Sequence, residues 1–183
     1  MSVQTIPKHV LDVSKHVLYE YYPEHRVEAP LPPDLLELCI GFLIEEKKEY
    51  WSNGHLKSHG IYVNGEKHWE WKEWYENSHL ESRGTFVNGE KDGKWKYWYM
   101  NGQLESQGNF VNGKEHGVWK QWYMSDEVGG SQLELQANYV NGELHGEWKE
   151  WHENGQLYIE GTYVNGEKHG EWKRWWDDGE LWT

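Results

Sequence analysis

Apolar and polar positions alternate along much of the chain with the two-residue period of a β-strand. Between residues 104 and 111, the alternate positions Leu104, Ser106, Gly108 and Phe110 fall on one face. A second stretch, Trp119 to Tyr123, is rich in aromatic residues, which suit a pleated and half-buried surface. The pattern predicts two short strands in this part of the chain.

Turn signals separate these two strands. Asn112-Gly113 follows the first strand, and both residues tolerate the positive φ that a tight hairpin turn requires. Gly117 is expected to close the loop before the second strand, and Asn101-Gly102 turns the chain back ahead of the first. The unit is therefore a β-hairpin, with Asn112 and Gly113 in structural roles.

The same unit recurs along most of the chain, which indicates a repeat array. The copies span residues 51–74, 75–98, 99–122, 123–151 and 152–175, with a partial sixth copy at 176–183. The fourth copy carries an insertion around residues 126–130. We expect a mainly β fold: an elongated, single-sheet antiparallel meander of repeated 24-residue β-hairpins.

Residues 1–50 do not repeat and are predicted to form a partly helical cap. Pro32-Pro33-Asp34 precedes an apolar stretch, which is typical of a helix start, and places a short helix at about residues 33–43. Terminal units of an array otherwise expose a core face, so this helix would cover the first copy. Trp69 stands where later copies have glycine, and we expect it to pack against this segment.

Composition changes this picture in one respect. Only 37% of the 183 residues are hydrophobic, and the mean hydropathy of -1.00 would ordinarily suggest disorder. However, all 14 tryptophans lie within the array, between Trp51 and Trp182. Periodic aromatic residues favour a folded sheet whose core consists of a few large rings.

The net charge of -13 bears on partners and location. An acidic surface repels nucleic acid and anionic lipid headgroups, so the sequence predicts no nucleic-acid partner and makes a membrane partner improbable. Cys39 is the only cysteine and the N-terminus has no apolar leader segment. Both features favour an intracellular, cytoplasmic protein, or for a viral protein the virion or host cytoplasm.

One column of glycines occupies the middle of the first strands. These glycines are expected to lie beneath tryptophan rings from the second strands, because a mid-strand glycine otherwise weakens a sheet. They are Gly60, Gly84, Gly108 and Gly161, with Ala137 in the fourth copy, and the rings are Trp71, Trp95, Trp119, Trp148 and Trp172. The leucines at the strand starts, Leu80 among them, are expected to share the face of Phe86 and its equivalents.

A second tryptophan column lies three residues after the first and should face the other side of the sheet. It shares that face with a lysine column, which makes the pair a candidate partner-binding surface. The residues are Trp74, Trp98, Trp122, Trp151 and Trp175 with Lys72, Lys96, Lys120, Lys149 and Lys173. Two other interpretations remain open: the sheet curls and buries both columns, or the lysine stems simply cover the rings.

No arrangement in the sequence points to catalysis, a cofactor or a metal. A histidine-rich column recurs once per copy, at His68, Asp92, His116, His145 and His169. Successive members lie two strands apart, or about 9–10 Å, too far for one zinc ion. They are expected to cap the hairpins or bond their backbone. We therefore predict no enzyme activity, no cofactor and no metal site.

The full pattern resembles the MORN-type repeat, most closely the longer variant found in bacterial proteins and giant DNA viruses. The residues that carry it read Tyr-x-Asn-Gly-x-Leu-x-Ser-x-Gly-x-Phe-Val-Asn-Gly, then Gly-x-Trp-Lys-x-Trp, between residues 51 and 183. The resemblance implies successive hairpins in one sheet. It also implies a scaffold or protein-interaction role, and some bacterial members are described as antitoxins.

Leu31 to Ile40 is weakly similar to the opening helix of an F-box, although a capping helix explains the same residues. Two functional hypotheses follow. The first is a non-catalytic protein-interaction module or scaffold that uses the sheet face with the second tryptophan column and the lysines, or the edge of the sheet. The alternative is an adaptor or inhibitor, F-box-like or antitoxin-like, whose N-terminal segment engages a second partner. A protein partner is expected in both, and the C-terminal sheet edge offers a route to a homo-oligomer.

Overall fold

The fold was analysed in a computed structural model, which describes residues 44–125 and 131–182. The chain divides into two units, Met1–Glu45 and Glu46–Thr183. The expected helix at residues 33–43, the F-box-like stretch and the predicted cap up to residue 43 lie outside the described residues, whereas residues 44–50 of that cap form a β-strand. The following description therefore concerns the second unit and its sheet.

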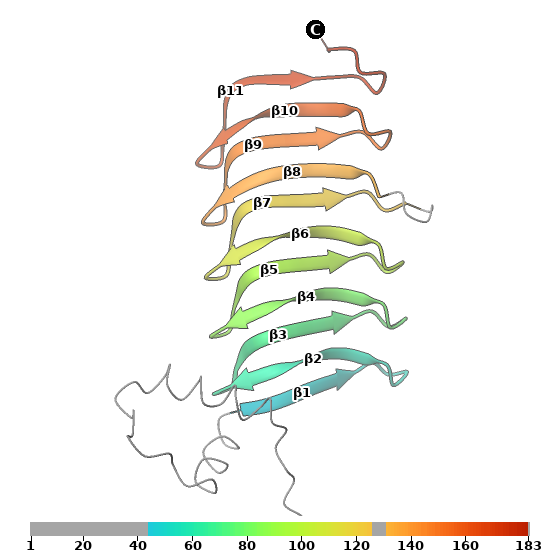
Figure 1. Ribbon diagram of the computed structural model, residues 1–183, viewed down its shortest axis with the longest axis vertical. Helices are drawn as coiled ribbons and strands as arrows, with labels where there is room; N and C mark the ends of the chain where they lie inside the picture. The colour runs from blue at the N-terminus through green and yellow to red at the C-terminus, as the bar shows by residue number, and fades with distance from the viewer. Residues whose placement is uncertain (1–43, 126–130, 183) are drawn as a thin grey trace, which may run out of the picture. The chain divides into compact units, whose positions relative to one another are not determined.

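Eleven strands form one sheet, in which each strand pairs with its neighbours in the sequence (Figure 1). This arrangement confirms the predicted single-sheet antiparallel meander. The strands are β1 (Ile44–Tyr50), β2 (Leu56–Val63), β3 (Glu66–Trp74), β4 (Leu80–Val87), β5 (Glu90–Trp98), β6 (Leu104–Val111), β7 (Lys114–Trp122), β8 (Leu133–Val140), β9 (Glu143–Trp151), β10 (Leu157–Val164) and β11 (Glu167–Arg174).

The Asn-Gly turns are tighter than predicted. Asn112 and Gly113 both have positive φ, 49° and 73°, and β7 begins immediately afterwards at Lys114. The prediction that Gly117 closes a loop was wrong, because Gly117 lies inside β7 with a φ of 74°. Its left-handed conformation, which glycine adopts at little cost, produces an irregularity in the strand and shifts the register between β6 and β7.

Tryptophan rings cover the strand glycines, as the sequence predicted. A β-carbon at Gly108 would overlap the indole ring of Trp119, so only glycine leaves room for the ring as it stands. The same overlap recurs in three other copies, at Gly60 with Trp71, Gly84 with Trp95, and Gly161 with Trp172. In the fourth copy Ala137 is fully buried and pairs directly with Trp148 across the β8–β9 ladder.

The best-buried part of the core lies near the beginning of the array. Trp71 and Trp95 are 3% and 1% exposed, and Phe86 packs between them. The rings meet edge to face, with 5.0 Å between the ring centres of Phe86 and Trp95. Tyr62 and Phe110 extend the cluster on either side. We call this side of the sheet the aromatic face.

Trp69 occupies a position that is glycine in the later copies, and its backbone keeps the conformation of that glycine. Its φ of 61° lies in the left-handed region, as do those of Gly93, Gly117, Gly146 and Gly170. The conformation is unfavourable for a residue with a β-carbon. The expected packing of Trp69 against the N-terminal segment involves residues outside those described.

A ladder of side-chain hydrogen bonds joins each copy to the next. The hydroxyl groups of Tyr75, Tyr99 and Tyr123 donate to the backbone carbonyls of Trp98, Trp122 and Trp151, at 2.8, 2.7 and 2.8 Å. At the first position Trp51 donates in the same way, through its indole nitrogen, to the carbonyl of Trp74. This first residue of each copy is therefore a connector between copies, a role the periodicity alone did not reveal.

Alkaline pH should weaken this ladder. Burial, reinforced by nearby glutamates, raises the pKa of Tyr75, Tyr99 and Tyr123 above the ordinary value of about 10. A raised pKa in the folded state contributes stability that is complete below pH 10 and is lost as pH rises through the folded value. We expect the urea midpoint to hold steady between pH 8 and about pH 9.5 and to fall above about pH 10.

A matched control separates the ladder from general alkaline effects. The triple variant Tyr75→Phe, Tyr99→Phe, Tyr123→Phe should be less stable at pH 8, by about 1 kcal/mol for each lost hydrogen bond. Its midpoint should then fall less steeply above pH 10 than that of the unaltered chain. An equal slope in both proteins would show that these hydroxyls do not govern the alkaline transition.

Candidate functional site: the lysine face of the sheet

The side of the sheet opposite the aromatic face carries a continuous row of polar side chains, most of which are cations. Residues that are paired across a ladder share a face, so the pairing can be followed from strand to strand. In sequence order the row is Lys72, Arg83, Lys96, Gln107, Lys120, Gln136, Lys149, Glu160 and Lys173, each directly opposite the next. We call this set the lysine row and this side the lysine face.

A row of tryptophan and leucine runs beside the lysine row. Its cross-strand pairs are Trp74 with Leu80, Trp98 with Leu104, Trp122 with Leu133, Trp151 with Leu157, and Trp175 with Leu181. All five tryptophans are half-buried. The lysines of the candidate site and its tryptophans thus lie on one face, and the sheet neither buries these rings fully nor leaves them bare.

The predicted place of the leucines was wrong. Strict alternation would put Leu80 on the aromatic face with Phe86, yet Leu80 pairs with Trp74 while Ser82 pairs with Glu73. Two residues advance on β4 for one on β3, which is a β-bulge. The bulge transfers Leu80 to the lysine face. The same shift recurs before Trp98 and Trp122, so it belongs to the repeat.

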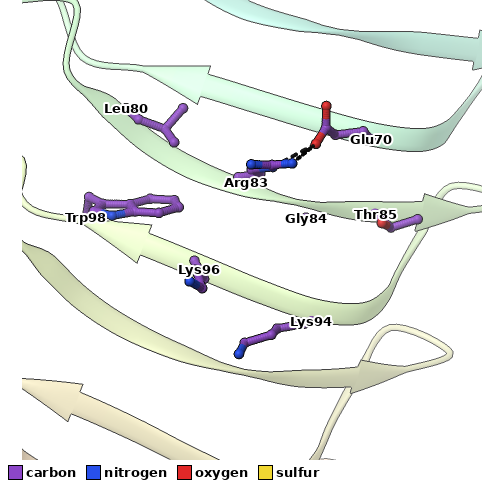
Figure 2. Close-up of a pocket in the computed structure, with 8 residues that line it drawn as sticks. All are labelled: Glu70, Leu80, Arg83, Gly84, Thr85, Lys94, Lys96 and Trp98. Atoms are coloured by element: carbon purple, nitrogen blue, oxygen red, sulfur yellow. Dashed lines mark hydrogen bonds and ion pairs between the residues drawn. The ribbon is translucent and has the colours of Figure 1, made fainter.

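A shallow hollow of about 330 Å³ lies on the lysine face over the backbone of Gly84. Figure 2 shows the side chains of Arg83, Lys94, Lys96 and Trp98 around it, on the neighbouring strands β4 and β5. The β-carbon direction of Gly84 points away from the hollow, to the ring of Trp95 on the aromatic face, so the strand backbone faces the hollow between the side chains of Arg83 and Thr85. A second hollow of about 220 Å³ takes the equivalent place over Gly161.

Ion pairs on this face follow one rule of spacing. A glutamate two residues before a lysine of the row lies near it: Glu70 with Lys72 at 2.7 Å, Glu147 with Lys149 at 3.6 Å, and Glu171 with Lys173 at 3.6 Å. Glu70 also accepts a hydrogen bond from Arg83 at 2.7 Å. Hydrogen bonding from Lys72, and to a lesser degree from Arg83, lowers the pKa of Glu70 although burial opposes the shift.

The aromatic face carries lysines of its own, which sequence reasoning missed. The Nζ atoms of Lys67, Lys91 and Lys168 lie over tryptophan ring centres at 3.9, 4.4 and 4.2 Å, a cation–π arrangement. Lys91 also donates to the hydroxyl of Tyr97 at 2.7 Å. Burial lowers the pKa of Lys91 and raises that of Tyr97. These lysines are committed to packing, unlike the lysine row.

The histidine-rich column has a structural use in part of the array. The Nδ1 atoms of His68 and His145 accept hydrogen bonds from the backbone N–H groups of Asn88 and Asn165, in the turn of the next hairpin. Sequence reasoning expected such backbone bonding. Among residues 44–125 and 131–182, no group of three or more His, Cys, Asp or Glu side chains is placed to hold a metal ion.

The comparison with family models concerns the array, residues 46–183. The family described as "MORN repeat variant" matches residues 46–64, 67–88, 91–112, 144–165 and 168–183, more than half of the chain. A search among curated proteins finds no match. In the part of the chain that the structure describes, no helix is long and apolar enough to cross a membrane.

Two similar solved structures are of TarM. The crystal structure of an S. aureus TarM mutant in complex with fondaparinux, alpha-GlcNAc-glycerol and UDP shares 12% identity, at a TM-score of 0.35. A second crystal structure of TarM shares 11%, also at 0.35. Each match covers 87% of this chain but only 27% and 26% of the TarM chains. The chain thus spans about a quarter of their length.

Proposed function

The chain belongs to the MORN repeat variant family, and from that premise we propose that it is a non-catalytic protein-binding module whose lysine face holds the partner. The observation behind this proposal is that two rows run side by side over the same strands: the lysine row, which is mostly cationic, and the row of tryptophan and leucine. Half-buried tryptophans offer apolar contact area, and tryptophan and arginine are the residues that most often dominate binding energy at protein interfaces.

The repulsion between like charges in the lysine row supports this proposal, because it lowers the stability of the sheet. Lys72, Arg83 and Lys96 stand directly opposite one another on three successive strands. Like charges in such positions destabilise a sheet, and although Glu70 pairs with Lys72 and Arg83, Lys96 has no such carboxylate in the described residues. Covering the tryptophan rings does not require charge, because leucine or methionine would cover them as well. A binding role gives the repeated cations a purpose that packing does not.

The face also suits an extended partner better than an enclosed small molecule. Its two hollows are shallow and lie over strand backbone, and the rows continue across many strands. A protein surface can follow such a face over several copies. We therefore propose an intracellular scaffold or interaction role, with a heterologous protein as the partner.

The test replaces Trp98 and Trp122 by serine and compares capture of partners from an extract of the native host. The double variant should lose the proteins that the unaltered chain captures, because it removes two neighbouring members of the tryptophan–leucine row. Trp176→Ser is the matched control, since Trp176 is 51% exposed and lies in a turn outside the row. That variant should capture the same proteins as the unaltered chain.

The urea midpoint of each variant establishes that it is folded before capture is compared. Undiminished capture by a folded Trp98→Ser, Trp122→Ser protein would remove the lysine face as the binding surface. Equal loss in the Trp176→Ser control would show that capture responds to any exposed tryptophan and would also count against the proposal.

A further inference from the structure

The middle of the lysine face differs from its two ends in charge. At both ends a glutamate stands two residues before the lysine of the row, as Glu70, Glu147 and Glu171. In the two middle copies that position holds Lys94 and Val118 instead. The substitution removes the neutralising carboxylate from Lys96 and Lys120, and in one copy it adds a further cation.

The cross-strand neighbours in the middle are also free of carboxylates. Lys96 lies between Arg83 and Gln107, and Lys120 lies between Gln107 and Gln136. Lys94 pairs with Asn109 and Val118 with Asn138. Within residues 44–125 and 131–182, no ion pair involves Lys94, Lys96 or Lys120. We call Arg83, Lys94, Lys96 and Lys120 the central cationic patch.

This concentration of positive charge stands out on a chain of net charge -13. Carboxylates on this face include Glu70, which already accepts a hydrogen bond from Arg83, and Asp92 and Glu90 toward the Asn-Gly end of β5, where they pair with Thr85 and Val87. Unneutralised cations that lie near one another repel each other and raise the free energy of the unbound protein. An anionic group that binds beside them relieves this repulsion.

Apolar surface borders the patch on the same face. Trp98 and Leu80 line the hollow together with Arg83, Lys94 and Lys96 (Figure 2). Val118, on β7, is 46% exposed. A ligand that places carboxylates over the cations would therefore also meet places for one or two apolar side chains.

From this juxtaposition we propose that the central cationic patch binds an acidic, extended segment of a partner protein, with an apolar side chain of the segment seated against Trp98 and Leu80. The proposal rests on the protein-binding function proposed above and adds the chemistry of the partner. It requires complementary charge, since acidic side chains meet a locally basic surface.

A protein segment fits the surroundings better than a nucleic acid or a bilayer. The patch is confined to strands β4 to β7, and glutamates flank it at Glu70 and Glu147. A membrane surface or a long polyanion would extend over those carboxylates and be repelled. A short acidic segment can end within the patch, and its apolar side chains can use the tryptophan.

Fluorescence anisotropy with a synthetic probe tests the proposal. The probe is a fluorescein-labelled peptide of twelve residues, made of glutamate and aspartate with two central leucines; the comparison peptide replaces each acid by its amide. The full chain at low salt should bind the acidic peptide, and the affinity should fall as salt screens the charges. The amide peptide should bind at least about tenfold more weakly, because charge-assisted hydrogen bonds are lost.

Variants locate the binding. Lys94→Gln with Lys96→Gln should weaken binding of the acidic peptide by about tenfold or more, since it removes two adjacent cations. Lys149→Gln with Lys173→Gln is the matched control, because those lysines lie in the same row but have glutamate neighbours. It should change the affinity less than about twofold, as for other neutralised surface charges.

Several outcomes would overturn the inference. Equal binding of the amide peptide would show that charge does not contribute to binding. An equal loss of affinity for the acidic peptide in the control variant would show that binding depends on the charge of the whole lysine face and not on the central cationic patch. Tighter, competing binding of phosphatidylserine vesicles or of single-stranded RNA would assign the patch to another anion. If the acidic peptide does not bind while partner capture still depends on Trp98 and Trp122, the inference fails and the proposed function stands. If the acidic peptide binds but partner capture does not depend on Trp98 and Trp122, the tryptophan–leucine row is rejected as the capture surface.

Discussion

Gly108→Val should destabilise the array by about 3 kcal/mol, the upper end of the usual cost of overpacking. A β-carbon at this position overlaps the six-membered and five-membered rings of Trp119. The indole must then leave its place, and its edge-to-face contact with Phe110, at 5.1 Å between ring centres, is lost with it. The shift of the urea midpoint measures this cost.

The comparison variant is Gly113→Ala in the adjacent turn. Gly113 has a φ of 73°, and the nearest atom that its new β-carbon would meet lies 3.6 Å away, on Glu90. Only the left-handed conformation is then penalised, by about 1–2 kcal/mol. We expect Gly108→Val to lower the midpoint more than Gly113→Ala, and equal or reversed midpoints would reject the close packing of ring on glycine.

A double-mutant cycle can assign the effect to the ring itself. If the clash with Trp119 is the cause, Trp119→Leu should cost less in the Gly108→Val background than in the unaltered chain. The two residues are in contact, so a coupling of about 0.5–3 kcal/mol is expected. Additive losses would mean that the valine disturbs the strand and not the ring.

The repeat made the sheet and its strand order predictable, because a 24-residue unit with two turn signals permits little besides a meander. The packing of tryptophan on the strand glycines followed from similar reasoning, since a mid-strand glycine weakens a sheet unless another group needs the space above it. Both inferences depend only on neighbours within one hairpin. Local sequence contains that information.

The bulge that carries Leu80 to the lysine face was not predictable in the same way. Alternation from Phe86 back through Ser82 leads to the wrong face, and only the pairing of Leu80 with Trp74 reveals the extra residue. A bulge is a relation between two strands, and single-strand periodicity does not encode it. The tryptophan–leucine row was therefore missed although each of its residues had been noticed.

Strand β1 was missed for a different reason. Its residues are mostly charged and show no apolar alternation. The period nevertheless contains a signal, because Lys47 to Tyr50 stands 24 positions before Trp71 to Trp74. Glu49 accepts a hydrogen bond from Ser58 just as Glu73 accepts one from Ser82, at 3.2 and 3.0 Å. Extending the repeat backwards by position, rather than by hydrophobicity, would have found the strand.

The sharpest test of the two faces compares Trp95→Ala with Trp98→Ala. The two tryptophans are three residues apart on β5 and point to opposite sides of the sheet. Trp95 is 1% exposed, packs on Phe86 and donates its indole N–H to the carbonyl of Thr85 at 3.1 Å. Trp98 is half-buried beside Leu80 at the edge of the hollow.

Trp95→Ala should lower the free energy of unfolding by about 3–5 kcal/mol, the usual cost of removing a large buried ring. That is a large share of the roughly 5–15 kcal/mol by which domains are stable, so the variant should unfold at a much lower urea concentration. Trp98→Ala should cost only about 1–2 kcal/mol, because a half-exposed ring loses less transfer free energy. If Trp98→Ala proved the more damaging of the two, the lysine face would be the true core, and the surface proposed for binding would have to be sought on the other side of the sheet.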